Sequence, residues 1–127
     1  MTQRPLVNII VAGGRDFDDY DLLKSVIDHM TSKLYQTHDI VIVSGDARGA
    51  DTLGKRYAHE HYNIGIGLKV MKADWDKYGK SAGYLRNQEM ADYSTHLIAF
   101  WDGKSRGTKH MIDIATRQNL KCHVVNY

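Results

Sequence analysis

The chain has 127 residues, of which 43% are hydrophobic and 25% are charged, and its formal net charge is +2. These values are typical of a globular protein, and we expect residues 1–127 to form a single domain. Because 17 basic residues are balanced by 15 acidic ones, the composition argues against nucleic acid as a partner. The one cysteine, Cys122, excludes an intramolecular disulfide and zinc sites built on cysteine pairs.

The sequence contains no recognisable targeting or membrane segment. Residues 1–5 are polar, unlike the start of a signal peptide, and no apolar run approaches the roughly 20 residues of a membrane-spanning helix. A lone cysteine also suits a reducing compartment. We therefore expect a cytoplasmic protein without a membrane partner.

Short apolar runs alternate with longer amphipathic stretches along the chain. The runs at 7–12 and 40–43 are rich in β-branched residues and end at glycine or serine, which predicts buried strands. Between them, from Leu23 to Leu34, apolar residues recur at helical spacing. The expected elements are, in chain order, strand 7–12, a helix after residue 18, strand 40–43, helix 51–62, strand 68–71, helix 81–93, strand 96–100, helix 108–119 and strand 121–125.

This alternation predicts an α/β fold. Continuous apolar strands are typical of a sheet that is covered on both faces. Right-handed crossovers then give a single Rossmann-like, doubly wound domain with a mainly parallel five-stranded sheet. In such sheets ligands bind at the carboxyl ends of the strands, near the point where the strand order reverses.

The first strand ends at a loop that suits an anion. The loop begins with Gly13, Gly14, Arg15 and Asp16. Paired glycines let the backbone approach a ligand, and Arg15 can form a forked hydrogen bond with phosphate or carboxylate. The alternative is a plain tight turn with a solvated arginine.

The second strand leads into a loop of small residues that opens a helix. Free N–H groups and the helix dipole make such a position an anion site. Asp46 argues mildly against a highly charged phosphate there and could hold a ribose hydroxyl. Alternatively, Asp51 caps the helix and the glycines only turn the chain. The candidate residues are Ser44, Gly45, Asp46, Ala47, Arg48, Gly49 and Asp51.

Two further segments add candidates. The loop after strand 96–100 again mixes glycine, cations and hydroxyls before a helix, although a solvated basic loop explains it equally well. Thr108 is the predicted N-cap of that helix. Trp75 or Tyr78 could stack on a base, but packing over a core edge is commoner. The candidates are Trp75, Tyr78, Arg86, Asn87, Trp101, Gly103, Lys104, Ser105, Arg106, Gly107 and Thr108.

For the histidines and the cysteine we predict no metal-binding or catalytic role. His59 and His61 lie two residues apart on a predicted helix and point in different directions, so we expect no metal site. The chain lacks a P-loop motif, and we expect no cofactor. Cys122 lies in the last strand, where core packing is the usual role.

Four segments together resemble the YspA-type branch of the SLOG superfamily, which also contains LOG phosphoribohydrolases, YpsA-like proteins and the nucleic-acid-binding protein DprA. They are VAGGRDF at 11–17, SGDARGAD at 44–51, ADWDKYGKSAGYLRN at 73–87 and FWDGKSRGTKHM at 100–111. The resemblance implies a Rossmann-like fold, a pocket for nucleotide-type ligands and, because related families often form dimers, a homo-oligomer.

The chain departs from the patterns of these families at two places. Asp46 stands where the family pattern has a glycine, and aspartate is among the few residues that tolerate a positive φ. The Pro-Gly-Gly-x-Gly-Thr-x-x-Glu motif of LOG enzymes is absent, so phosphoribohydrolase activity is not transferred.

Three functions remain open. In the first, the protein is a sensor or sequestering module whose Arg15, Arg48 and Arg106 neutralise a nucleotide phosphate. In the second, it hydrolyses an N-glycosidic or phosphate bond, with Asp51 as the candidate catalytic residue before Asp46 and Asp102. In the third, it binds single-stranded nucleic acid in the DprA manner, which the small net charge disfavours.

Overall fold

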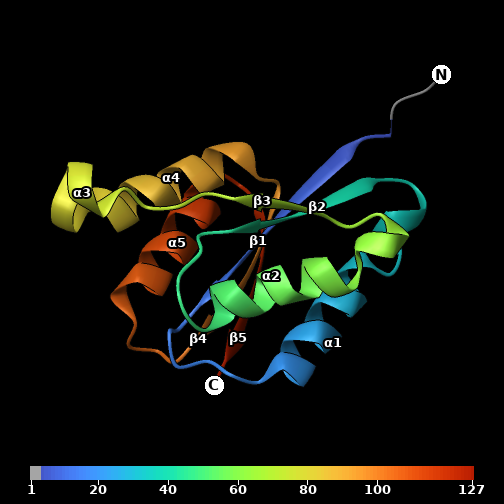
Figure 1. Cartoon of the computed structure of the whole chain (residues 1–127), viewed down its shortest axis with the longest axis horizontal. Helices are drawn as coiled ribbons and strands as arrows, with labels where there is room; N and C mark the ends of the chain where they lie inside the picture. The colour runs from blue at the N-terminus through green and yellow to red at the C-terminus, as the bar shows by residue number, and fades with distance from the viewer. Residues whose placement is uncertain (1–3) are drawn as a thin grey trace.

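Five parallel strands form the central layer of the molecule (Figure 1). The computed structural model describes residues 4–127, so the expectation for residues 1–5 falls partly outside the described range. The strand order is β3-β2-β1-β4-β5, which confirms a Rossmann-like, doubly wound α/β domain. The strands are β1 (Leu6–Gly13), β2 (Asp39–Ser44), β3 (Gly67–Val70), β4 (His96–Trp101) and β5 (Lys121–Asn126).

Helices cover both faces of this sheet. In Figure 1, α1 and α2 lie on one side and α4 and α5 on the other, while α3 lies beyond the end of α4. The α-helices are α1 (Tyr20–Thr31), α2 (Ala50–Glu60), α3 (Trp75–Tyr78), α4 (Ala82–Tyr93) and α5 (Arg106–Arg117). Three single-turn 3₁₀ helices are η1 (Leu34–Gln36), η2 (Tyr62–Ile64) and η3 (Gly79–Ser81). No helix among residues 4–127 is long and apolar enough to cross a membrane.

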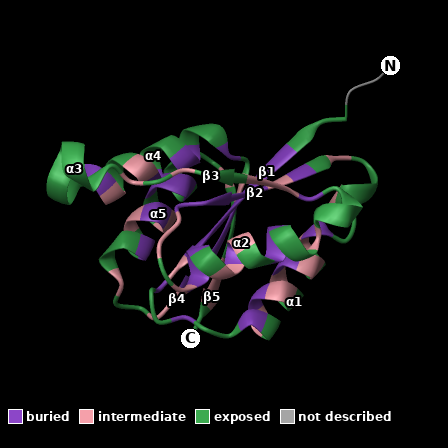
Figure 2. Cartoon of the chain, viewed as in Figure 1, coloured by how far each residue is buried: buried purple, intermediate pink, exposed green. Residues whose placement is uncertain are grey.

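The continuous apolar strands supply both halves of the core. Along β1, Ile9 and Val11 pack with the residues of α1 and α2, whereas Ile10 and Ala12 pack with α4 and α5. This is the alternation of a pleated strand, whose successive side chains point to opposite faces. The inner strands β1, β2 and β4 are accordingly buried, whereas the edge strands β3 and β5 are partly exposed (Figure 2).

Some sequence expectations differ from the structure at element ends. The first helix ends at Thr31, and Leu34 reaches the core from a separate 3₁₀ turn. The short helix α3 was not expected, and the Asp74 side chain caps it by accepting a hydrogen bond from Lys77 N at 3.1 Å. Thr108 is not an N-cap, because Ser105 takes that role and accepts from Thr108 N.

The expectation that Cys122 packs in the core is wrong. Cys122 is exposed. Its strand, β5, lies at one edge of the sheet and is paired only with β4 within residues 4–127. An edge strand can leave a side chain in solvent, which the order of residues along the chain does not reveal.

A polar network joins α1 to α2. The Tyr57 hydroxyl donates to Asp28 Oδ1 at 2.7 Å, and Lys24 Nζ donates to Asp28 Oδ2 at 2.7 Å. At the N-terminus of α1, the Tyr20 hydroxyl donates to Glu60 Oε1 in the last turn of α2 at 2.7 Å. Burial alone would raise the pKa of Asp28, but the hydrogen bonds from Lys24 and Tyr57 together lower it.

We expect Tyr57→Phe to lower the free energy of unfolding by about 1.5 kcal/mol, because it removes a buried donor to a charged carboxylate. Urea denaturation measures the change. The matched control is Tyr62→Phe, because Tyr62 is 75% exposed, and we expect it to change stability by less than about 0.5 kcal/mol. Equal losses in the two variants would contradict a role for the network.

Candidate functional site

A cavity of about 470 Å³ lies at the carboxyl ends of β1 and β4. These two strands are neighbours, yet the chain runs from β1 outward to β2 and β3 before it returns to β4. The cavity is therefore at the topological switch point, where the loops on either side diverge and leave a crevice. Its volume lies within the range of small-molecule sites.

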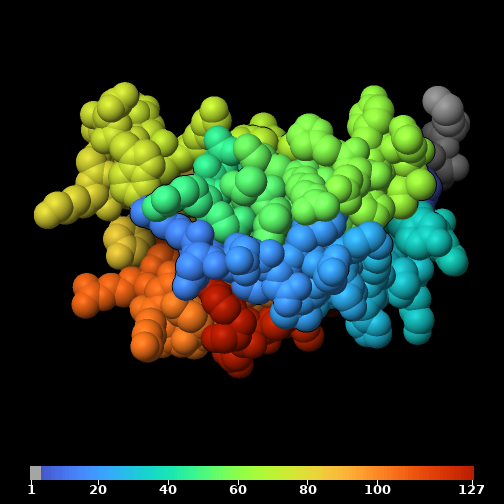
Figure 3. All heavy atoms as spheres, turned by 60° about the horizontal axis from the view of Figure 1, so that its bottom comes forward, coloured from blue at the N-terminus to red at the C-terminus, as the bar shows by residue number. Residues whose placement is uncertain are grey.

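Gly13, the last residue of β1, and Gly14, which follows it, lie in close contact with distant parts of the chain. A Cβ on Gly14 would lie 1.8 Å from the hydroxyl oxygen of Tyr127, and one on Gly13 would lie 2.5 Å from the Phe100 carbonyl oxygen. Tyr127 donates to Asp16 Oδ1 at 2.6 Å. Figure 3 shows the red C-terminal segment against the blue segment that follows β1. The C-terminal tyrosine thus holds the loop that carries Arg15.

The loop after β2 closes onto the loop after β1. Gly49 has a φ of 79°, and a Cβ there would lie 2.1 Å from the Gly14 carbonyl oxygen. Ala50 N donates to the same oxygen at 3.3 Å. Only glycine permits both this backbone conformation and so close a contact. The N-terminus of α2 is therefore held against the end of β1.

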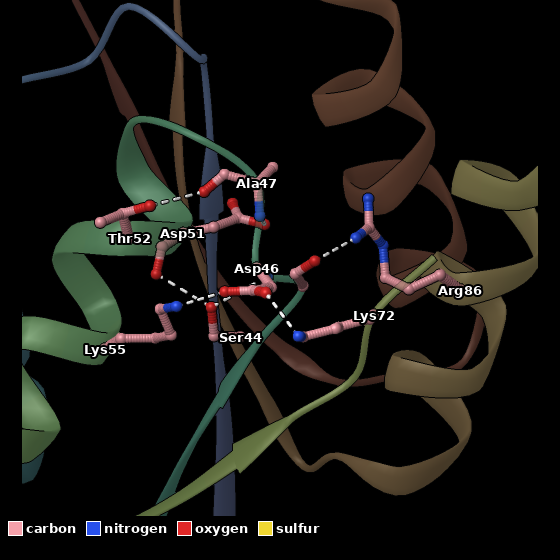
Figure 4. Close-up of polar contacts among 9 residues, drawn as sticks. Ser44, Asp46, Ala47, Asp51, Thr52, Lys55, Lys72 and Arg86 are labelled. Atoms are coloured by element: carbon pink, nitrogen blue, oxygen red, sulfur yellow. Dashed lines mark hydrogen bonds and ion pairs between the residues drawn. The ribbon is translucent and has the colours of Figure 1, made fainter. Parts of the chain in front are cut away.

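Hydrogen bonds within the second loop fix its shape (Figure 4). The Ser44 hydroxyl is buried, donates to the Asp51 carbonyl oxygen at 2.9 Å and accepts from Asp46 N at 3.2 Å. Thr52 Oγ1 donates to the Ala47 carbonyl oxygen at 2.8 Å. Ser44 therefore stabilises the loop through its hydrogen bonds and does not line the cavity.

Asp51 is a buried carboxylate at the cavity wall. Its exposed fraction is 5%, and burial raises its pKa to about 6, although the Arg86 cation and the hydrogen bond from Ala47 N oppose the shift. Ala47 N donates to Asp51 Oδ2 at 3.3 Å. The N-cap of α2 is Gly49, without a side-chain bond, so Asp51 does not cap the helix.

Arg86 reaches the site from α4 and lies beside Asp51. Its Nη1 donates to the Gly45 carbonyl oxygen, and its Nε donates to Asn87 Oδ1 at 3.1 Å. A Cβ on Gly45 would lie 2.6 Å from Arg86 Nη1 and 2.8 Å from Asp51 Oδ2. Burial lowers the pKa of Arg86, partly offset by Asp51, but a guanidinium remains charged at neutral pH. The cavity wall thus holds a fixed cation beside a carboxyl group.

Asp46 occupies the position where the family pattern has glycine, and it has a φ of 63°. The expected tolerance of aspartate for this backbone conformation is confirmed. Its carboxylate accepts from Lys55, and Lys72 Nζ lies 3.6 Å away. The hydrogen bond from Lys55 is the main cause that lowers the pKa of Asp46. Asp46 lines a second cavity of about 360 Å³.

The first cavity has an apolar part beneath the helix N-termini. Ala12, Met90 and Met111 contribute to its lining, and the latter two lie on α4 and α5. Asn87 Nδ2 donates to the Gly107 carbonyl oxygen at 3.2 Å and so joins the two helices. Asp102 accepts from the backbone of Lys104 and Ser105, both at 2.8 Å, which shapes the third loop.

The structure brings together most of the residues expected to bind a ligand. Those in the first cavity are Gly13, Gly14, Arg15, Asp16, Ala47, Asp51, Trp75, Arg86, Asn87, Ser105, Gly107 and Thr108. Those that line the second cavity are Arg15, Gly45, Asp46, Ala47, Arg48, Trp75 and Arg86. Those that line neither of these two cavities are Ser44, Gly49, Tyr78, Trp101, Gly103, Lys104 and Arg106.

Sequence reasoning missed several lining residues. On α4, Gly83 and Met90 lie at helical spacing from Asn87, which the sequence did predict, and this spacing is a signal that could have identified them. Lys72 and Ala73 line the second cavity because β3 pairs with β2, which only the sheet order reveals. The other missed residues are Ala12, Lys80, Tyr84 and Met111, whereas Asp102, which was expected only as a further catalytic candidate, also lines the first cavity.

The fold is similar to that of DNA processing protein A from Helicobacter pylori, whose structure was solved to describe its single-stranded DNA binding mode. The TM-score is 0.63 at 20% identity over 95% of this chain, which spans 65% of the length of that solved chain. This finding overturns the expectation that argued against nucleic acid as a partner. Net charge sums the whole surface, whereas phosphate binding depends on local charge. The second of the two cavities is lined by four basic side chains and one acidic one, which are Arg15, Arg48, Lys72, Arg86 and Asp46.

The sequence comparisons agree with the family that the motifs resemble. The chain is 33% identical over 123 residues to the Gene 61 protein of Mycobacterium phage D29, and the match covers 94% of each protein. Residues 7–78 match the model of the YspA, cpYpsA-related SLOG family. Because the family match spans more than half of the chain, and the phage relative nearly all of it, the chain belongs to the YspA, cpYpsA-related SLOG family.

Proposed function

We propose that residues 1–127 form one domain that binds a nucleotide or nucleotide-derived phosphate ligand at the carboxyl ends of the strands, as a sensor or sequestering module. One observation carries the proposal. The N-termini of α2 and α5 and the guanidinium groups of Arg15 and Arg86 line one cavity at the switch point of the sheet. Helix N-termini and guanidinium groups both attract phosphate oxygens.

The two parts of the cavity suit the two parts of a nucleotide. The phosphate would lie near Arg15 and Arg86, whose guanidinium groups supply positive charge at the cavity wall. The base would lie over Met90 and Met111, whose thioethers make favourable contacts with aromatic rings. Asp51, beside Arg86, is within the wall that a ribose would face.

The first test is a thermal shift assay with a panel of nucleotides, followed by chromatography of the small molecule. A ligand at about 100 times its Kd should add about 2.7 kcal/mol, which raises Tm by several degrees. Arg15 is exposed, so Arg15→Ala should abolish the shift without changing the Tm of the free protein.

The matched control is Arg106→Ala, which removes an equally exposed arginine that lines neither cavity. We expect this variant to keep the full shift, although the sequence pattern had placed Arg106 at the phosphate. A loss of binding in the Arg106 variant, with binding kept in the Arg15 variant, would contradict the proposed site.

The same assay tests hydrolysis, for which the burial of Asp51 is the supporting observation. Perturbed carboxyl groups in a cavity are candidates for acid–base chemistry. If the protein cleaves its ligand, a free base or phosphate appears in the chromatogram, and Asp51→Asn abolishes turnover but keeps binding. Equal loss of turnover and binding would remove Asp51 from the catalytic role, and an intact ligand would favour the sensor.

The raised pKa of Asp51 predicts a pH dependence of stability. The folded state holds the proton up to about pH 6, whereas the ordinary pKa is 3.8, so stability falls as pH rises between these values. Urea denaturation at pH 4 and pH 7 should show the native chain losing about 2 kcal/mol relative to Asp51→Asn. The control is Asp18→Asn, at an exposed aspartate. If the free energies of unfolding of the native chain and Asp51→Asn differ by the same amount at both pH values, the raised pKa of Asp51 is refuted.

Single-stranded nucleic acid is the second candidate ligand, which the likeness to the Helicobacter pylori protein favours. The exposed Trp75 beside Arg15 and Arg86 combines an aromatic surface with cations, as strand-binding surfaces do. With about three or four phosphate contacts, a plot of log affinity against log salt should have a slope of about −2 to −3. A slope near zero for a fluorescent oligonucleotide would exclude this candidate.

A further inference from the structure

The two cavities adjoin. Arg15, Ala47, Trp75 and Arg86 line both of them, so a ligand that extends from the first cavity along these shared residues reaches the second. Trp75 is 52% exposed, and its ring lies against α4, where a Cβ on Gly83 would be 3.3 Å from the ring edge. Trp75 therefore stands at the junction, with much of its surface free.

The second cavity differs from the first in its chemistry. Beside the shared arginines it is lined by Arg48 and Lys72, and its other walls are the small residues Gly45 and Ala73. The one acidic side chain in its lining, Asp46, is already paired with two lysines. The second cavity thus suits a polar, negatively charged group and lacks the methionine lining of the first.

The sizes of the cavities bear on the length of the ligand. Each of them, at about 470 Å³ and 360 Å³, falls within the usual range for a small-molecule site. A mononucleotide that occupies the first cavity leaves the second one to water. A ligand that continues through its phosphate fills both.

We propose that the site takes a dinucleotide unit rather than a mononucleotide. This inference rests on the proposed function. The first nucleoside lies over the methionines, the linking phosphate lies between Arg15 and Arg86, and the second sugar and its phosphate lie beside Arg48 and Lys72. The shared chemistry of a free dinucleotide and of two residues in a single strand is the phosphodiester that joins two nucleosides.

The test compares nucleoside monophosphates with linear 5′-phosphorylated dinucleotides of the same base by isothermal titration. Because the dinucleotide adds charge-assisted contacts, it should bind at least about tenfold more tightly. The double substitution Arg48→Ala and Lys72→Ala should remove that gain and leave mononucleotide affinity within about twofold. Both side chains are exposed, so the variant should fold.

A substitution that removes a negative charge, instead of positive ones, tests the charge of the second cavity. Asp46→Asn removes one negative charge and keeps a residue that tolerates a φ of 63°. It should strengthen dinucleotide binding about threefold or more and leave mononucleotide binding unchanged. Arg106→Ala, outside both cavities, serves as the control.

The outcomes distinguish failure of the dinucleotide proposal from failure of the proposed nucleotide binding. Equal affinity for mononucleotides and dinucleotides, or equal weakening of both by the double substitution, overturns the two-unit ligand but leaves nucleotide binding intact. Binding of neither ligand overturns both. With oligothymidylates of increasing length, affinity that stops rising at two nucleotides supports a free dinucleotide, and affinity that continues to rise supports a strand laid through both cavities.

Discussion

The contact between the first two loops is the constraint on which the site depends. The Gly14 carbonyl oxygen accepts from Ala50 N, and Gly49 lies so close to Gly14 that no side chain fits between them. This contact holds the N-terminus of α2 at the end of β1. It thereby sets the distance between Arg15 on the first loop and Asp51 in the first turn of α2, both of which line the first cavity.

Burial of Asp51 is energetically unfavourable, and the surrounding residues offset only part of its cost. Arg86 and the N–H of Ala47 favour the charged carboxylate, but removal from water is the larger effect, and the pKa rises to about 6. Polar groups that weaken the fold in this way are common where a ligand binds or reacts. The arrangement differs from that of Asp46, whose carboxylate is paired with Lys55 and Lys72 and whose pKa is lowered.

Two ligand classes fit this site for the same physical reason. A nucleotide and a single strand both present phosphates to cations and flat bases to apolar or aromatic side chains. The balanced composition, with a net charge of +2, hid the local excess of cations around the second cavity, whose lining has four basic side chains and one acidic one. The two classes differ in length, and the junction at Trp75 between two cavities makes length the property to measure.

The sequence by itself determined the order of strands and helices and the loops that carry the site. An apolar run such as 7–12 is stable as a strand only when both of its faces are buried. The glycines and cations that follow such runs mark the loops, which lie at one edge of the sheet. Such patterns are local, so they can be read residue by residue. The positive φ of Asp46 was suggested only by the family resemblance, whose pattern has a glycine at that position.

Only the tertiary structure decided which side chains enter the cavities. Arg106 and Arg15 occupy similar loops in the sequence, yet Arg15 lines both cavities and Arg106 lines neither. Arg86 reaches Gly45 across 41 residues of chain, and Lys72 joins the second cavity because β3 pairs with β2. The direction of a side chain and its distant neighbours depend on how helices pack on the sheet, and no local pattern encodes that packing.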